Sequence, residues 1–447
     1  GFQVIYSAYP GETPIISGGM VISNWTSIGG GLYKAQVSPG MQFRQLYING
    51  VRGVRARAPN AGSYARLIGW DTNNMLIDVA ATNIPSFSSD PGNPAEIIIQ
   101  LRWTAWRGRI ASISNNGPMS SITLMEPERS IMFNKPDPPK FNDEPFFLEN
   151  AREFVDQPGE WYLKSSTGEL FYLPKPGEDM ATAQVVAPVV TTLINVAGSG
   201  LNTPVHDLTF KGLIFQDATW LAPNMYGHVD HQANQFNTMF QDYGNYAYYH
   251  TEAAVMLSAA QRVTLTGCTF RNLGAVGLDL GSGSVSNVIN GNLFDDISDN
   301  AINDAAPAIA PENPSDLRTV NQGNLFANNF ITDIGLDYKG AVGVFIGYAH
   351  NETVQHNEIY NVPYSGISDG WGWSFSPSVS SNNVIQNNHI MRYDAALADG
   401  GGIYTLSAQP GSVIQSNYVQ DAWYNSYAQH VPIAPVYLAT PQRCVNG

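Results

Sequence analysis

One phrase recurs between Val263 and Ala422, as VTLTGCTFRNL (263–273), NVINGNLFDDI (287–297), NLFANNFITDI (324–334), TVQHNEIYNV (353–362), NVIQNNHIMRY (383–393) and SVIQSNYVQDA (412–422). Stacked on one another, the copies align one polar column at spacings of 24, 37, 28, 31 and 29 residues: Cys268, Asn292, Asn329, Asn357, Asn388 and Asn417. Two residues later comes an apolar column: Phe270, Phe294, Ile331, Ile359, Ile390 and Val419. A repeat of this length with alternating polarity predicts one coil of a solenoid.

A second apolar column follows the polar column by 10 residues in three coils and by 15 in the other two, and it predicts two strands in every coil: Leu278, Ile302, Val344, Ile367 and Ile403. Coils of this kind cannot bury their apolar faces alone, so they stack. An amide at each bend can pair with its copies above and below and satisfy the turn backbone. The pattern predicts an all-β fold, a right-handed parallel β-helix. A β-sandwich, the alternative, predicts no columns in register.

The repeat is interrupted, which divides the chain into three parts. Residues 1–21 are predicted to be early β-helix strands, 22–185 an inserted antiparallel β domain, and 186–447 the main β-helix. Hairpin turns such as Asn49-Gly50 support the insertion, which we expect to pack as a separate unit on the early coils. We expect its basic and aromatic run to pack rather than to touch a sugar: Arg102, Trp103, Trp106, Arg107 and Arg109.

A long loop, 216–255, lies within one early coil and carries His228, His231, His250 and several tyrosines. Long loops in compact domains are usually functional, and this composition favours a carbohydrate groove. The H-x-x-H spacing is weak evidence for zinc, so no metal site is predicted. Calcium stays possible at an acidic patch that more simply serves turns, formed by Asp295, Asp296, Asp299 and Asp304.

Composition bounds the partners. The 447 residues carry a formal net charge of −15, which disfavours nucleic acid and anionic lipid as ligands. Apolar runs are too short to predict a membrane span. The chain opens in mid-strand without Met and is interpreted as a processed or trimmed product; at the other end, either 430–447 caps the last coil or the natural chain continues.

Longer phrases carry a family resemblance: AYPGETPIISGG (8–19), LYINGVRGVRARAPN (46–60), PGEWYLKSSTGELFYLP (158–174), YSGISDGWGWS (364–374) and ADGGGIYTLSAQPG (398–411). Through them the chain resembles the secreted β-helix carbohydrate-active proteins near glycoside hydrolase family 141. The resemblance implies an extracellular protein acting on a polysaccharide or oligosaccharide of the fucose- or xylose-containing kind. The chain departs from the pattern at ATPQRCVNG (439–447) and at Asp369.

A glycosidase needs two carboxyl groups about 5–5.5 Å or about 6.5–9.5 Å apart, and coils stack at about 4.8 Å. Two coils with extra residues, around 336–340 and 394–402, flank the coil of Glu358 and are expected to form a pocket. We therefore predict four catalytic candidates: Asp399, Glu358, Asp337 and Asp369. Asp399 ranks first because three glycines follow it, and the resemblance implies the same place. Each candidate also has a structural alternative, as a turn or solvated carboxylate.

Substrate-binding candidates surround them: His389, Lys339, Trp371, Trp373, Tyr404 and His250. The favoured function is a glycoside hydrolase that needs no cofactor. A polysaccharide lyase, with Lys339 or Arg392 as base, and a non-catalytic carbohydrate-binding surface protein are the alternatives. The acidic charge mildly disfavours the lyase, because a uronate polymer would be repelled at long range.

Overall fold

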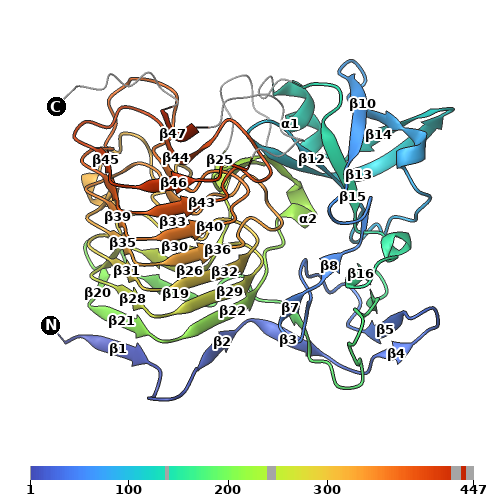
Figure 1. Ribbon diagram of the computed structural model, residues 1–447, viewed down its shortest axis with the longest axis horizontal. Coiled ribbons are helices and arrows are strands. Elements are labelled where there is room, and N and C mark those ends of the chain that lie inside the picture. Colours follow the sequence, from blue (N-terminus) through green and yellow to red (C-terminus); the bar gives the residue numbers. More distant parts are fainter. Residues whose placement is uncertain (1, 136–139, 239–247, 424–433, 439–447) are drawn as a thin grey trace.

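The structure is a computed structural model that describes residues 2–135, 140–238, 248–423 and 434–438. A stack of coils forms one side of the molecule, and an insertion built from antiparallel strands stands against it (Figure 1). Among the described residues the longest helix, α1 (Glu128–Asn134), has seven residues, and no helix could cross a membrane.

Each coil has three strands rather than the predicted two, so the β-helix has three parallel sheets of eight strands. The first sheet contains β1 (Val4–Ser7), β21 (Leu208–Lys211), β28 (Thr264–Thr266), β31 (Val288–Asn290), β35 (Leu325–Ala327), β39 (Thr353–Gln355), β42 (Val384–Gln386) and β45 (Val413–Gln415). It precedes the asparagine column in each coil. The sequence prediction missed it because its three-residue strands were absorbed into the repeated phrase.

The other two sheets hold the two predicted columns. The second contains β2 (Ile15–Ser17), β22 (Ile214–Ala218), β29 (Thr269–Leu273), β32 (Leu293–Ile297), β36 (Phe330–Thr332), β40 (Glu358–Tyr360), β43 (His389–Met391) and β46 (Tyr418–Gln420). The third contains β19 (Ile194–Ala197), β26 (Ala253–Ser258), β30 (Val276–Leu280), β33 (Ile302–Asp304), β37 (Val344–Ile346), β41 (Ile367–Asp369), β44 (Gly401–Thr405) and β47 (Ala434–Leu438).

The predicted register is confirmed. Phe270 pairs with Phe294, and the column continues through Ile331, Ile359 and Ile390 to Val419. The first two rings stack with centroids 4.5 Å apart and planes within 9°. The second column, from Leu278 to Ile403, is likewise in register. Both columns belong to one continuous buried core, which is the interior of the β-helix.

The asparagine column is a hydrogen-bonded ladder. The side-chain oxygen of Asn329 accepts from both the backbone N–H and the side-chain amide of Asn292, each at 3.0 Å. Asn357 receives the same two bonds from Asn329, at 3.0 and 2.9 Å. Each amide also donates to a carbonyl one coil away, as Asn329 does to Ile289 at 3.0 Å. Both polar atoms of the buried Asn329 side chain are therefore paired.

A second ladder runs at the neighbouring corner, and the sequence analysis did not find it. Asn287 and Asn324 repeat the same pattern, and in the next coil Glu352 takes the place of asparagine. The Glu352 carboxyl accepts from the Asn324 backbone at 2.8 Å and from its amide at 3.2 Å. Burial, and then the nearby Asp304, raise the pKa of Glu352 well above its ordinary value. A neutral carboxyl group can replace the amide in this ladder.

The insertion starts where β3 (Gly19–Ile22) pairs with β18 (Val185–Pro188), and it has two lobes. The larger lobe is a six-stranded antiparallel barrel of β10 (Ala65–Asp71), β11 (Leu76–Ala80), β12 (Glu96–Gln100), β13 (Ala105–Asn116), β14 (Met119–Leu124) and β15 (Pro145–Glu149), closed by the pairing of β12 with β13. The smaller lobe contains β4 (Thr26–Ser27), β5 (Tyr33–Gln36), β6 (Tyr47–Ile48), β7 (Val51–Arg52), β8 (Val54–Arg55), β16 (Glu160–Lys164) and β17 (Glu169–Tyr172).

The insertion is less separate than expected, and it does not pack on early coils alone. The long loop supplies β23 (His228–Gln232), β24 (Gln235–Asn237) and β25 (Tyr248–His250), and β23 pairs with β13 of the barrel. The backbone N–H of Ala398, in a late coil, donates to the carbonyl of Arg102 at 2.7 Å. The loop thus joins barrel and coils. At the other end of the chain β47 adds a last strand to the third sheet, and 439–447 lie outside the described residues.

We expect Asn329→Ala to lower the free energy of unfolding by about 2–3 kcal/mol, because it removes the acceptor of the buried Asn292 backbone N–H and the side-chain donor to the Ile289 carbonyl. Thermal unfolding followed by circular dichroism measures the loss. Asn290→Ala is the matched control, since that side chain is half-buried and accepts one surface hydrogen bond from Asn328. Equal effects of the two changes would contradict the ladder's role.

Glu352→Gln should stabilise the protein more at pH 8 than at pH 5. The raised pKa of Glu352 gives a contribution to stability that is complete below the ordinary carboxyl pKa and is lost as pH rises through the folded-state pKa. Glutamine keeps the amide of the ladder at every pH. Melting temperatures from pH 4 to 9 test this against Glu358→Gln, a change at an exposed carboxylate; a stabilisation independent of pH would refute it.

Candidate active site

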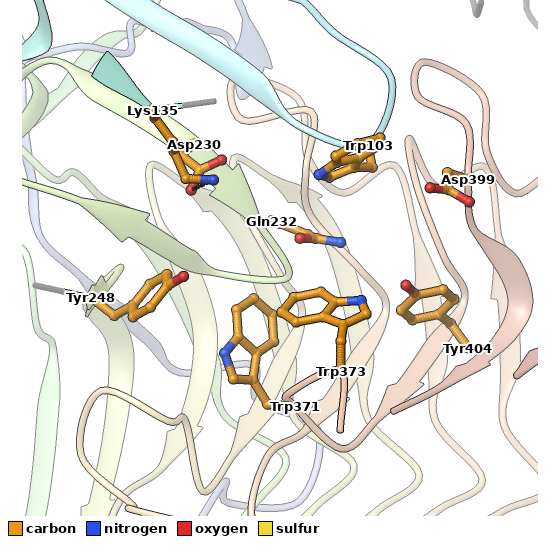
Figure 2. Close-up of a pocket in the computed structure, with 9 residues that line it drawn as sticks. All are labelled: Trp103, Lys135, Asp230, Gln232, Tyr248, Trp371, Trp373, Asp399 and Tyr404. Atoms are coloured by element: carbon orange, nitrogen blue, oxygen red, sulfur yellow. Dashed lines mark ion pairs between the residues drawn. The ribbon is translucent and has the colours of Figure 1, made fainter. Parts of the chain in front are cut away.

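A cavity lined by carboxylate and aromatic side chains lies where the barrel, the long loop and the last coils meet. It has a volume of about 440 Å³ and is lined by Trp103, Lys135, Asp230, Gln232, Tyr248, Trp371, Trp373, Asp399 and Tyr404. We call it the aromatic cavity. Figure 2 shows Trp371 and Trp373 on one side, Trp103 facing them, and Asp230 and Asp399 at opposite ends. Three separate segments of the chain build it, so no single motif could reveal it.

Trp371 and Trp373 follow β41 in a tight turn. Gly370 has φ of +94°, and a Cβ there would lie 2.2 Å from the carbonyl oxygen of Leu406, so only glycine fits. The two indole rings lie 5.2 Å apart at 67°. Trp371 is 7% exposed whereas Trp373 is 52% exposed. Trp373 therefore offers a free aromatic surface to a ligand, and Trp371 supports it from below.

Asp399 is held by contacts on its backbone and on one oxygen. Its φ of +61° lies in the left-handed region. The Tyr364 hydroxyl donates to its carbonyl at 2.9 Å, and the Tyr437 hydroxyl donates to Oδ1 at 2.8 Å. A Cβ at Gly400 would lie 2.4 Å from Asp394 Oδ1 and 2.7 Å from the Tyr364 ring, so a larger residue there would displace these side chains. These contacts aim the Asp399 carboxylate into the cavity.

Behind Asp399, the side chain of Asp394 is fully buried. Burial, and then the charge of Asp399, raise the pKa of Asp394 well above its usual range. Gln232 extends the network from the cavity side, since its amide donates to the Tyr364 hydroxyl at 3.2 Å. A neutral carboxyl group next to a lining carboxylate is the kind of environment found at reactive sites.

Asp230, the second carboxylate of the aromatic cavity, comes from the long loop. Its Oδ2 lies 2.8 Å from the Lys135 ammonium, at the end of α1, and accepts from the Asn237 amide at 2.8 Å. The Lys135 charge stabilises the negative form of Asp230. The sequence analysis treated the H-x-x-H segment 228–231, which contains Asp230, only as weak evidence for zinc. Its pairing partner lies 95 positions earlier in the chain, at Lys135, so no local signal could connect them.

The structure separates the predicted catalytic candidates. Asp399 lines the aromatic cavity, but Glu358 lies exposed on the outer face of the second sheet and does not line it. Asp369 points into the β-helix, where the Asn383 amide donates to it at 3.0 Å, and burial raises its pKa to about 7. Glu358 lies on β40 of the second sheet, whereas Asp399 directly precedes β44 of the third sheet, so the two do not share the aromatic cavity.

Asp337 is engaged elsewhere. Its Oδ2 accepts from Ser298 at 2.6 Å, Gln45 at 2.8 Å and Arg52 at 3.1 Å. Burial would raise the pKa of Asp337, but the Arg52 charge and the Ser298 hydrogen bond outweigh it and lower the pKa to about 2. This carboxylate joins the coils to the insertion and lies outside the aromatic cavity. The extra residues of the two coils therefore line two different pockets rather than one.

The predicted binding residues divide in the same way. Trp371, Trp373 and Tyr404 line the aromatic cavity. Lys339 lines a different pocket, and His389 packs on Tyr418 with ring centroids 5.2 Å apart, on the face that carries Glu358. His250 lies outside the lining, with Nε2 3.4 Å from Asp279 Oδ2.

The basic and aromatic run of the barrel mostly packs, as expected. Trp106 is fully buried, Arg107 pairs with Glu96 at 2.6 Å, and Arg109 pairs with Glu128 at 2.6 Å. Trp103 is the exception. The backbone hydrogen bond from Ala398 to Arg102 holds this segment against the late coils, so that Trp103 lines the aromatic cavity together with Asp399.

One group in the described part of the chain has metal-ligand geometry. His228, His231 and Asp299 are buried with ligand atoms within 4.8 Å of one another. However, the Gly340 N–H donates to His231 Nδ1 at 3.2 Å, which leaves the imidazole proton on Nε2, facing Asp299 Oδ1 at 3.0 Å. That arrangement fits a hydrogen-bonded histidine–aspartate pair better than a metal centre.

The acidic patch considered for calcium is dispersed. Arg52 binds Asp296 at 2.7 Å, Asp299 faces His231, and Asp304 points into the core. Asp295 is the remaining member, and its pKa is raised by partial burial and by Asp296.

Comparisons with known proteins agree with this architecture. Residues 34–175 match a model of the GH141 insertion domain, and residues 313–430 match the right-handed β-helix region. A solved structure described as a glycoside hydrolase is 31% identical, with a TM-score of 0.84, over 91% of this chain and 75% of its own.

More distant structures are also similar. XylC in complex with xylose is 11% identical over 98% of this chain, with a TM-score of 0.47. PfbA, a surface adhesin of Streptococcus pneumoniae, is 12% identical over 56% of this chain, with a TM-score of 0.32. No curated protein sequence matches.

Proposed function

The chain belongs to glycoside hydrolase family 141, and we propose that the aromatic cavity is its active site, with Asp399 and Asp230 as the two carboxyl groups of a glycoside hydrolase. One observation carries the proposal: these are the two carboxylates among the residues that line the cavity, and they lie at opposite ends of it (Figure 2). A glycosidase needs a carboxyl group on each side of the bond that it cleaves.

The rest of the lining fits a sugar ring. Trp373 and Trp103 offer aromatic faces on opposite sides, and the apolar face of a sugar packs on such rings (Figure 2). Gln232 and Tyr404 place polar groups between them, suited to hydroxyl groups. A volume of about 440 Å³ is within the range of small-ligand pockets. The substrate is therefore proposed to be a polysaccharide or oligosaccharide end that enters between barrel and coils.

The site also supplies the chemistry of glycoside hydrolysis. One carboxyl group protonates the glycosidic oxygen as it leaves, and the other, charged, acts directly on the sugar or through a water. Lys135 stabilises the charge of Asp230, and Tyr437 occupies Oδ1 of Asp399. The second oxygen of Asp399 is thereby directed towards the ligand. Both supports come from segments far from the acids in sequence.

Replacing either acid should abolish most of the activity. We expect Asp399→Asn and Asp230→Asn each to lower kcat by about 10²–10⁴-fold, the range that a general acid or base contributes. Release of reducing sugars from a panel of plant polysaccharides measures it, with melting temperatures as the check on folding. Azide added to the inactive variants then distinguishes the two roles by which one it rescues.

Glu358→Gln is the control that decides between the two possible sites. It changes an exposed carboxylate on the second sheet and should leave kcat unchanged. If Glu358→Gln loses activity while Asp230→Asn keeps it, the site lies on the outer wall and the proposal is wrong. Unsaturated products absorbing in the ultraviolet would instead indicate a lyase. If no polysaccharide yields any product, the result would favour a non-catalytic carbohydrate-binding protein.

Tyr437→Phe should lower kcat/KM by roughly tenfold, because a hydrogen bond to a charged group contributes about 1.5–3 kcal/mol. The ring still stacks on Tyr404, whose centroid lies 5.2 Å away. Steady-state kinetics measure the effect. Tyr418→Phe is the matched control, since that ring is 61% exposed on the second sheet; equal losses in both variants would remove Tyr437 from the site.

A further inference from the structure

A second pocket lies between the insertion and the coil loop that carries Asp337 and Lys339. Its volume is about 290 Å³, and we call it the cationic pocket after the five basic side chains in its lining: Arg52, Arg55, Arg57, Arg107 and Lys339. They come from β7, β8, β9 (Arg57–Ala58), β13 and the loop. Figure 1 shows β7 and β8 on the side of the insertion that faces the coils. In a chain with a net charge of −15, so many cations in one pocket are unexpected.

Three of the five cations have carboxylate partners. Arg52 binds Asp296 at 2.7 Å and Asp337 at 3.1 Å. Arg55 binds Glu149 at 2.8 Å. Arg107 binds Glu96 at 2.6 Å and Glu149 at 2.9 Å. These ion pairs hold the insertion rigid and attach it to the coils. The positive charges of Arg52, Arg55 and Arg107 are therefore balanced within the protein. Their presence does not explain the other two cations.

Lys339 has no carboxylate within ion-pair distance among the described residues. Its Nζ donates to the carbonyls of Gly335 at 3.0 Å and Leu336 at 2.8 Å, which fixes its direction and, within the described part of the chain, leaves its third N–H without an acceptor. Burial, opposed by Asp337 and reinforced by nearby arginines, lowers the pKa of Lys339 to about 8. An anion bound in the pocket would stabilise the charged form of Lys339 and so offset the effect of burial.

Arg57 is the second cation with no ion pair to a described carboxylate, and it brings an aromatic wall. Its guanidinium lies 3.5 Å above the Phe147 ring and 5.4 Å from that of Tyr64. It donates to the carbonyls of Pro59 at 2.9 Å and Ser63 at 2.8 Å, which hold it in place. On this side the pocket is open to solvent, because Ala61, which also lines it, is exposed. A ligand could therefore enter from this side.

We propose that the cationic pocket binds the carboxylate of an acidic sugar, a uronate, with Lys339 as its principal contact. The two acids in the lining do not prevent it, because Arg52 pairs with Asp337 and Arg55 and Arg107 pair with Glu149. The volume suits one sugar ring, and Tyr64 and Phe147 give it an apolar side. The choice of a sugar rests on the proposed hydrolase function. The pocket would then hold an acidic residue of the same polysaccharide, apart from the aromatic cavity.

The test is calorimetric titration of the full chain carrying Asp399→Asn, so that binding is measured without turnover. The probes are methyl galacturonoside, its neutral counterpart methyl galactoside, and sodium sulfate. We expect the uronate to bind and the neutral sugar not to bind. Lys339→Met should weaken binding of the uronate by at least about tenfold, which is the contribution of a charged hydrogen bond. Lys211→Met, at an exposed lysine on β21, should leave it unchanged.

Three results would overturn the proposal: equal binding of the neutral sugar, uronate affinity unaffected by Lys339→Met, or sulfate binding at least as well as the uronate. Arg57→Leu is the second variant in case Lys339→Met fails to fold, and it should also weaken the uronate. Trp373→Ala should not, because that ring belongs to the aromatic cavity. Because the readout is binding, a failure here is distinguishable from a failure of the hydrolase assignment, which product release decides.

Discussion

The structure depends on one constraint: a coil buries polar backbone at each bend, and each bend must be satisfied by the next coil. The asparagine ladder meets it. Each amide accepts two hydrogen bonds from one neighbouring coil and donates to both, as Asn329 does with Asn292, Asn357 and the Ile289 carbonyl. This ties the stacking of coils to a fixed register. The stacked Phe270 and Phe294 rings are positioned by the same register.

A wall built this way is regular, so a site has to be added to it. The insertion does this by leaving the β-helix at β3, returning at β18 and leaning its barrel over the late coils. The hydrogen bond from Ala398 to Arg102 places Trp103 opposite the turn that holds Asp399. The long loop then extends the barrel sheet through β23 and brings Asp230 to the other end. The aromatic cavity exists because three distant segments meet.

The contact between the two lobes of the insertion also explains why charge is unevenly distributed. Arg44, Arg55 and Arg107 surround Glu96, which is almost fully buried, and the two latter share Glu149. Burial would raise the pKa of Glu96, but these arginines hold it well below its ordinary value. Such a cluster is rigid, and removing one of its charges would strongly destabilise the fold because the partner would stay buried and unpaired. Once the arginines are used here, Arg57 and Lys339 are left as cations facing an open pocket.

The sequence by itself determined the β-helix, its register and the existence of an insertion, because each coil repeats the same burial problem at the same spacing. It also placed Asp399, Trp371, Trp373 and Tyr404 near one another. The two tryptophans follow β41, whereas Asp399 precedes β44 and Tyr404 lies within it, and β41 and β44 are adjacent in one sheet. It missed the strands such as β28, which are too short to show alternation. Only the tertiary structure decided which carboxylates share a cavity. Asp230 and Lys135 meet across the joined loop and barrel, while Glu358 and Asp337, close in the repeat, face different surfaces. Periodicity specifies which coil a residue belongs to, but the folding of the insertion against the coils decides which surface becomes a site.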